Sequence, residues 1–141
     1  MRFVTRSRVH VDRIATAWAI RRLIDPQAMF VFVDRNADVS GLDAIPFDMR
    51  GAELGHHCGR CTFEALLDGY ELRDPALRRM GEIVHAMDMP FDADTNEDVT
   101  DLTAAFNKIR DADITDDERL RRGRGICTEL YVKCGGKEDG E

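Results

Sequence analysis

The sequence predicts an α/β fold, in which a small, mostly parallel sheet opens the chain, helices cover that sheet, and the C-terminal half is helical. A short apolar stretch, Arg2–Thr5, is followed by a helical pattern that begins at Asp12 and stops at Asp25-Pro26. A continuous apolar run, Met29–Val33, follows directly. Strand, helix and strand in this order predict a βαβ unit, whose two strands are parallel and joined by a right-handed crossover.

The elements of this first half differ in how deeply they are expected to lie. The helix that begins at Asp12 carries apolar residues on most of its surface, so it should be largely buried. Met29–Val33 is rich in β-branched and aromatic residues, which is typical of a strand covered on both faces. Ile45–Met49 is expected to form a third strand that ends near Asp48.

The second half carries clear helix-start signals. Thr62 is expected to cap a short helix over residues 63–67, and Asp74 followed by Pro75 predicts a helix that continues until Pro90. Two capping boxes, each an N-cap side chain with a glutamate three residues later, predict two further helices: Asp94 with Glu97, and Thr115 with Glu118.

Length and composition limit the classes of protein. A chain of 141 residues suits one domain, expected over residues 1–134, with a flexible tail at 135–141 (GGKEDGE). The net charge of −7 argues against direct binding of nucleic acid. No apolar run is long enough to span a bilayer and no secretory segment is present, so the four cysteines are expected in a reduced, cytoplasmic protein. A homodimer is left open.

One stretch, Ile45–Phe63, concentrates side chains that bind divalent metals: Asp48, Glu53, His56, His57, Cys58 and Cys61. In open α/β sheets, ligands bind beyond the carboxyl ends of the strands. His10 and Asp12 follow the first strand, and Asp88 ends the helix that begins at Pro75, so the fold could bring them to the same edge. The alternative is a polar surface loop that carries two histidines by chance.

Several of these residues have structural alternatives. Asp12 precedes a helix and could be its N-cap, while Asp48 and Asp88 could be turn residues. His85 is expected to face solvent or a neighbour on its own helix and receives no role. Adjacent histidines point in different directions on a regular strand, so one of His56 and His57 would bind metal and the other would contact substrate or a carboxylate.

The cysteines allow two interpretations. Cys58 and Cys61 have the C-x-x-C spacing of half a zinc site or of a redox pair. Cys127 and Cys134 could complete a zinc site, but they lie seven residues apart on one apolar helix stripe, where cysteine is an ordinary core residue. We therefore expect both to be buried thiols without metal.

Most basic residues are arginine, since lysine occurs only at positions 108, 133 and 137. Arginine binds oxyanions through a planar fork of donors, although a GC-rich genome produces the same bias. The candidates for holding a tetrahedral oxyanion near the metal are Arg6, Arg8, Arg13 and Arg60.

Three segments together resemble the chromate-resistance family, specifically the ChrB C-terminal domain: VTRSRVHVDRIATAWAIRRLIDPQAMFVFV, IPFDMRGAELGHHCGRCTFEALL and DPALRRMGEIVHAMD. The resemblance covers the chain from Phe3 to about Cys134. It implies a part in chromate resistance, as a sensor or handler of chromate or a similar oxyanion. In that family the domain often follows a DNA-binding domain or is fused to a sulfurtransferase. Neither is found in these residues, so no direct transcriptional role is expected.

A more distant resemblance links HVDRIATAW, FDMRGAELGHH and the later AMD to the DHH phosphoesterases. It implies metal ligands at His10, Asp12, Asp48, His56 and Asp88, and a phosphate contact at His57. The first motif has a single aspartate where that superfamily usually has two, so one metal is expected. The alternative functions are therefore a metal-dependent hydrolase of phosphoester bonds, or an interaction module without activity.

The expected cofactor is one divalent transition metal (manganese, iron or zinc), and the expected ligand is a small oxyanion or a phosphoester. The predicted metal ligands are Asp12, Asp48, Glu53, His56, His57 and Asp88, with His10 as a further candidate.

Overall fold

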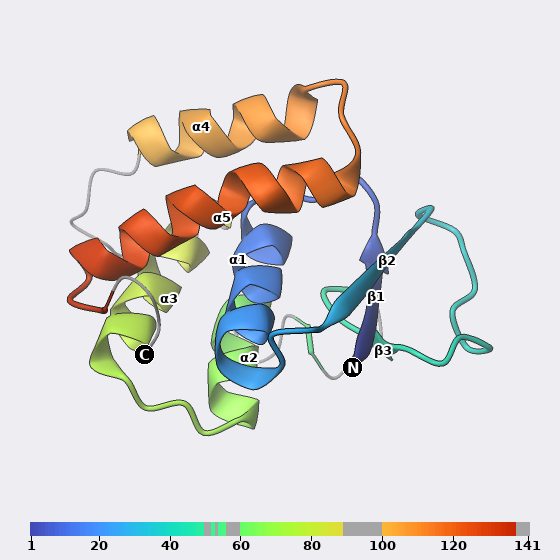
Figure 1. Ribbon diagram of the computed structural model, residues 1–141, viewed down its shortest axis with the longest axis horizontal. Helices are drawn as coiled ribbons and strands as arrows, with labels where there is room; N and C mark the ends of the chain where they lie inside the picture. The colour runs from blue at the N-terminus through green and yellow to red at the C-terminus, as the bar shows by residue number, and fades with distance from the viewer. Residues whose placement is uncertain (50–51, 53, 56–59, 89–99, 138–141) are drawn as a thin grey trace.

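The computed structural model describes residues 1–49, 52, 54–55, 60–88 and 100–137. In the first half, the described residues form three strands and one helix with a π-helical end: β1 (Arg2–Arg6), α1 (Val11–Ala19), η1 (Ile20–Ile24), β2 (Met29–Val33) and β3 (Ile45–Pro46). The described part of the second half contains the helices α2 (Thr62–Gly69), α3 (Pro75–Asp88), α4 (Thr100–Asp111) and α5 (Asp116–Lys133) (Figure 1). The predicted α/β fold with a helical C-terminal half is confirmed.

The sheet is parallel, with the strand order β2-β1-β3. The central strand β1 is buried at Phe3, Val4 and Thr5. β2 lies at the edge of the sheet and is only half-buried, with 62% of Met29 exposed. The prediction of a strand covered on both faces is therefore wrong, because none of the five residues of β2 is fully buried. In the described sheet the strand pairs with β1 alone.

The third strand is shorter than predicted. β3 ends at Pro46, after which the Phe47 amide donates to the carbonyl of Val4 at 3.0 Å. Asp48 then adopts a left-handed backbone with a φ of 49°, which is incompatible with an extended strand. This turn aims the Asp48 side chain away from the sheet ladder and toward the helices, where it bonds Thr62.

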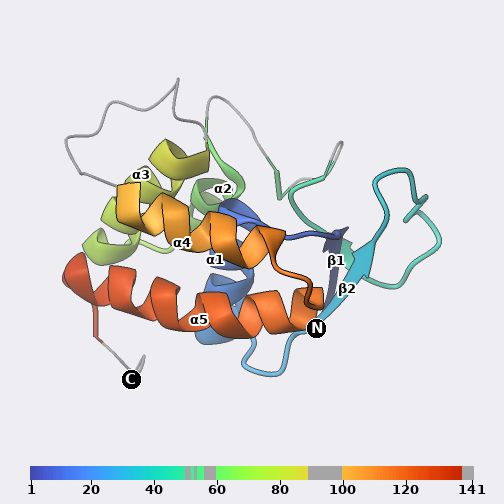
Figure 2. The ribbon, with the colours of Figure 1, turned by 90° about the horizontal axis from the view of Figure 1, so that it is seen from above.

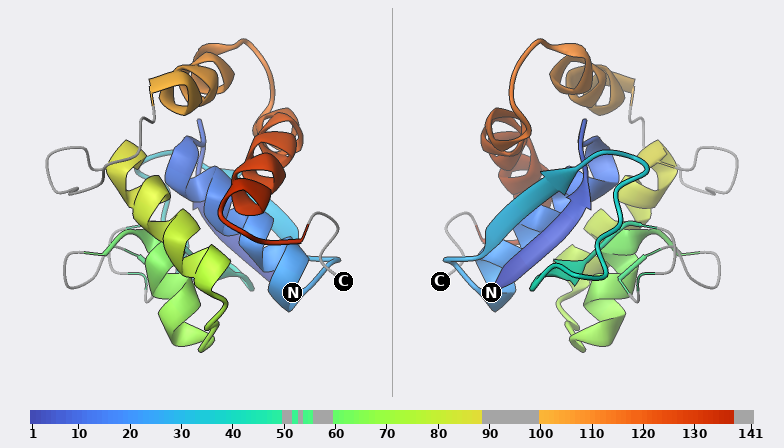
Figure 3. Two further views of the ribbon diagram at one scale, coloured as in Figure 1. Left: turned by 90° about the vertical axis from the view of Figure 1, so that its left-hand side faces the viewer. Right: turned by 90° about the vertical axis from the view of Figure 1, so that its right-hand side faces the viewer.

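α1 is the central helix, as predicted from its apolar surface. The sheet lies along one side of it, α2 and α3 pack on a second side, and α5 packs on a third (Figures 1 and 3). The contact with α5 is close because Gly123 has no side chain: a Cβ there would lie 2.3 Å from Cγ2 of Ile14. One continuous apolar cluster runs from Phe3 in the sheet through α1 to Tyr131 in α5.

Most of the testable helix-start predictions are confirmed. The Asp74 carboxylate accepts from the amide of Ala76 at 2.9 Å, and the Thr115 hydroxyl accepts from the amide of Glu118 at 3.1 Å. The helix predicted at 63–67 is longer, at 62–69, and its N-cap is Cys61 rather than Thr62. The box of Asp94 and Glu97 lies outside the described residues.

α4 lies alongside α5 (Figure 2). The turn between them is held by the buried Arg119, which donates to the carbonyls of Ile109 and Ala112 and pairs with Asp116 at 2.9 Å. None of the described helices combines the length and the apolar character needed to cross a membrane.

Candidate functional site at the amino end of α2

The first helical amides of α2 are satisfied by a carboxylate from another helix. Asp12 lies buried in the first turn of α1, and its two oxygens accept from the amides of Thr62 and Phe63, each at 2.9 Å. These amides have no partner within their own helix, and a negative charge suits the positive end of the helix dipole. The interpretation of Asp12 as the N-cap of its own helix is wrong: His10 occupies that position, and Asp12 caps α2 instead.

A cavity of about 250 Å³ lies beside this cap, at the carboxyl ends of β1 and β3. It is lined by His10, Asp12, Arg13, Asp48 and Asp88, which come from three separate segments of the chain. Arg13 pairs with Asp48 across it: Nε lies 3.1 Å from Oδ2, and Nη2 donates to the Asp48 carbonyl at 3.0 Å. The other Asp48 oxygen accepts from the Thr62 hydroxyl at 2.9 Å.

The surroundings of His10 in the cavity favour the neutral imidazole. Burial lowers its pKa from the ordinary value, and the nearby Arg110 lowers it further, against a hydrogen bond to Asn107 that raises it. Nε2 lies 2.9 Å from the Asn107 amide oxygen, which can only accept, so this contact favours the tautomer with the hydrogen on Nε2. Nδ1 then keeps a lone pair, the form of histidine that can bind a metal.

A second group of polar side chains lies on the other side of the α2 terminus. Cys61, Glu64 and His85 bring one potential ligand atom each to within 4.8 Å of one another, where α2 packs on α3. Nδ1 of His85 lies 2.6 Å from Oε1 of Glu64. All three are well buried, with 0% of Cys61, 13% of the Glu64 side chain and 12% of the His85 side chain exposed.

Comparison with known proteins identifies the family. The family described as ChrB, C-terminal domain, matches residues 3–134. The chain belongs to this family. Among curated proteins, Protein ChrB of Cupriavidus metallidurans (strain ATCC 43123 / DSM 2839 / NBRC 102507 / CH34) is 40% identical over 88 residues, which are 62% of this chain and 27% of that protein. No solved structure matches the chain.

In this member of the ChrB C-terminal family, the predicted metal ligands are placed in part. The structure brings His10, Asp12, Asp48 and Asp88 together around the cavity, whereas Glu53, His56 and His57 lie outside the described residues. Among the described residues, only Cys61, Glu64 and His85 bring three potential ligand atoms close enough to one another to bind a single metal ion.

The four candidate arginines have different surroundings. Arg13 alone among them lines the cavity. Arg6 donates to the carbonyls of Asp34 and Ala37, at 2.7 and 3.1 Å. Arg8 is exposed, with a left-handed φ of 60°. Arg60 pairs with Asp68 at 3.4 Å and lines a different cavity, next to Glu64 and His85. Their side chains therefore do not form one common oxyanion site.

Sequence analysis missed the role of His85, which was expected to face solvent or its own helix. Its partner Glu64 is 21 residues away, on a different helix. Gly81, one turn before His85 on α3, offers a local signal: a Cβ there would lie 3.2 Å from Cγ of Glu64. The missing side chain at Gly81 therefore leaves room for Glu64 to approach α3 beside His85.

The cysteines differ in burial. Burial raises the pKa of the Cys61 thiol, and the negative charges of Asp12 and Glu64 add to this effect, although a hydrogen bond from the Glu64 amide opposes it. Cys127 is buried, as predicted, and burial raises its pKa as well. Cys134 is only half-buried at the end of α5, so the prediction that Cys134 is a buried thiol is wrong. Because Cys58 lies outside the described residues, the four-cysteine zinc site stays untested.

Proposed function

We propose that this domain acts in cytoplasmic chromate resistance as a sensor or handler of chromate or a similar oxyanion, and that it binds a divalent transition metal. Membership of the ChrB C-terminal family supports the chromate-resistance role. The observation that carries the proposal is the cavity in which His10, Arg13 and Asp48 meet with Asp12 and Asp88 at the carboxyl ends of the parallel strands. Ligands of open α/β sheets bind at such an edge.

The cavity suits a small ion better than a large organic ligand. Its volume of about 250 Å³ is close to that of eight water molecules, at about 30 Å³ each, and below the range of about 300–1,000 Å³ typical of pockets for drug-sized ligands. Arg13 supplies a planar fork of N–H donors, which matches the oxygens of a tetrahedral dianion. Asp48 holds that fork beside the cavity through Nε and Nη2 of Arg13.

A metal-dependent hydrolase of phosphoester bonds is the second candidate, because the same cavity gathers an imidazole, three carboxylates and an arginine. Two of these carboxylates are already engaged in hydrogen bonds and an ion pair within the protein, which a hydrolase would not require of its metal ligands. Asp12 caps α2 through both oxygens, and Asp48 bonds Arg13 and Thr62. We therefore favour binding over hydrolysis, and expect only weak turnover of generic phosphodiesters with manganese.

Calorimetric titration with chromate tests the proposal. The unmodified chain should bind chromate, and Arg13→Lys should weaken binding about tenfold or more, since lysine lacks the planar fork. Arg124→Lys on the exposed surface of α5 is the matched control and should bind normally. Equal affinity in all three proteins would contradict an oxyanion site at Arg13. Rapid manganese-dependent hydrolysis of a phosphodiester would instead favour the hydrolase.

A further inference from the structure

Three chemically different metal-binding groups meet between α2 and α3. Cys61 is the N-cap residue of α2, Glu64 lies in the first turn of that helix, and His85 lies in the last turn of α3. One ligand atom from each lies within 4.8 Å of the others. A thiolate, an imidazole and a carboxylate form a donor set that zinc and other transition metals of similar softness accept.

A purely structural reading explains only part of this cluster. In that reading, Glu64 completes a capping box by accepting from the Cys61 amide at 3.2 Å. It also accepts the hydrogen bond from His85, and its other oxygen lies 3.8 Å from Nη1 of Arg60. Serine, threonine, aspartate or asparagine would cap the helix better than cysteine, so capping alone does not account for Cys61. Gly81 keeps the space beside the Glu64 side chain open, so that Glu64 and His85 can meet.

We infer that Cys61, Glu64 and His85 bind one transition-metal dication of the zinc class, with a fourth coordination position left open. A cavity of about 330 Å³ lies against Glu64 and His85 and is also lined by Arg60, Arg78 and Glu82. A ligand entering it would reach the open position. The inference deepens the proposed function and rests on its metal, which it assigns to three residues outside the predicted set.

The chemistry of binding balances without any redox step. The Cys61 thiol loses its proton to water as the sulfur–metal bond forms, and His85 binds through a nitrogen lone pair. The metal offsets the negative charge that the carboxylates of Asp12 and Glu64 place around the Cys61 sulfur. A cation at this point makes a deprotonated sulfur favourable even though the surroundings disfavour it in the metal-free protein.

Cobalt(II) titration of the full chain, purified without a histidine tag, tests the assignment. Cobalt substitutes for zinc and gives a thiolate-to-metal charge-transfer band in the near ultraviolet when sulfur is a ligand. The unmodified protein should show this band at one metal per chain. Cys61→Ser should abolish it, and His85→Ala should weaken cobalt binding at least tenfold. Cys127→Ser is the matched control, since it removes a buried thiol outside the cluster and should keep the full band.

The outcomes separate this site from its alternatives. A full band in Cys61→Ser, or a band lost only in His10→Asn or Asp88→Asn, would overturn the assignment. Circular dichroism checks folding, and His85→Gln serves if Cys61→Ser does not fold: it removes the imidazole, so unchanged cobalt affinity would contradict the site.

Chromate titration of the metal-free protein is a separate experiment that tests the proposed function. Chromate binding without a cobalt band refutes this site alone, whereas a band without chromate binding refutes the proposed function alone.

Discussion

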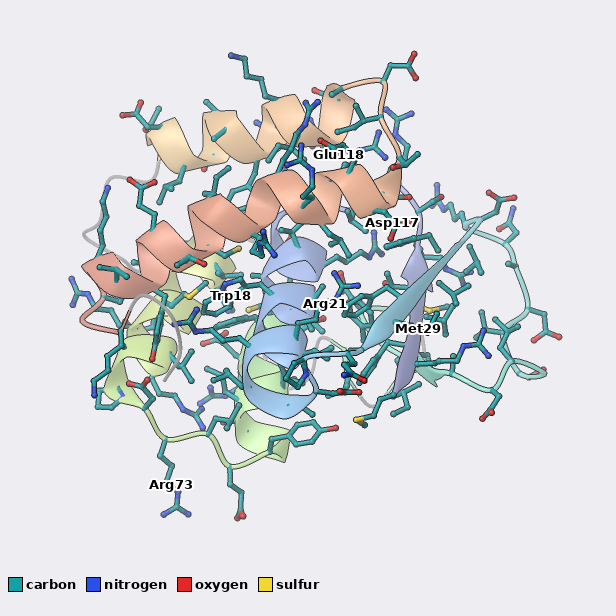
Figure 4. All side chains as sticks on the ribbon, viewed as in Figure 1. Trp18, Arg21, Met29, Arg73, Asp117 and Glu118 are labelled. Atoms are coloured by element: carbon teal, nitrogen blue, oxygen red, sulfur yellow. The ribbon has the colours of Figure 1, made fainter. Side chains whose placement is uncertain are left out.

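The two flanks of α1 carry opposite chemistry. The flank that packs against α2 and α3 carries side chains with lone pairs that can bind a metal, such as Asp12 and Cys61. We call it the donor flank. The flank that packs against α5, here called the arginine flank, borders a cavity of about 320 Å³. The charged residues that line this cavity are four arginines and one aspartate: Arg21, Arg22, Arg121, Arg124 and Asp117. Figure 4 shows Trp18 and Arg21 along the first helical segment, with Asp117 in the first turn of α5. Four arginines therefore meet at this cavity although the net charge of the protein is −7.

Two of the four arginines at this cavity, Arg21 and Arg22, lie over aromatic rings. The Arg22 guanidinium lies 5.3 Å from the ring centre of Trp18 and 5.0 Å from that of Tyr131. The Arg21 guanidinium lies 4.6 Å from the ring centre of Phe30. Each guanidinium packs its flat face on a ring while its edge donates to a backbone carbonyl, that of Ala28 for Arg21 and that of Lys137 for Arg22.

The donor flank is instead held by buried hydrogen bonds to the backbone. Asp12 shows this, because its carboxylate satisfies two amides of α2. The comparison teaches that one helix can join two different surfaces when each is stabilised by its own kind of contact. The donor flank depends on a few directional bonds, and the arginine flank depends on packing.

The largest effect is expected on the donor flank. Asp12→Ala leaves the amides of Thr62 and Phe63 buried without a partner, which should cost about 2–4 kcal/mol in the free energy of unfolding. Urea denaturation followed by circular dichroism measures the loss. Asp117→Ala on the exposed arginine flank is the control and should change stability by about 0.5 kcal/mol or less. Equal losses in both variants would erase the distinction between the flanks.

An intermediate effect is expected where α5 contacts α1. Gly123→Ala places a Cβ 2.3 Å from Cγ2 of Ile14, which forces the helices apart and should cost about 1–3 kcal/mol. Gly125→Ala, two residues along the same helix, meets nothing within 4 Å and should stabilise the protein by up to about 1 kcal/mol through helix propensity. Thermal unfolding of both variants compares them. The same sign in both would show that the contact between α1 and α5 is looser than the structure indicates.

The smallest effect is a pH dependence at the exposed start of α5. Hydrogen bonds from Arg121 and Arg122 lower the pKa of Glu118 from 4.5 to about 2. Its ordinary value applies in the unfolded chain, so this stabilisation is complete above pH 4.5 and is lost as the pH falls from 4.5 towards 2. Glu118→Gln should therefore make the melting temperature less dependent on pH in this window. Glu129→Gln, an exposed change further along α5, should keep the slope of the unmodified protein.

Parts of the candidate site could be predicted because their signals are local. His10 and Asp12 follow an apolar strand, and Asp48 follows another, so the rule for parallel sheets places them at one edge. The cavity contains all three together with Asp88. The duty of Asp12 could not be predicted in this way, since the amides that it caps lie 50 and 51 residues further along the chain.

The sequence alone determined the order of the elements and the starts of α3 and α5. Each depends on contacts between residues a few positions apart, as with Asp74 and Ala76 or Thr115 and Glu118. Only the tertiary structure decided that β2 is an edge strand and that His85 meets Glu64. The physical reason is that burial and side-chain pairing depend on which elements pack together. A local sequence pattern gives an element's type, but the elements that pack against it come from distant parts of the chain.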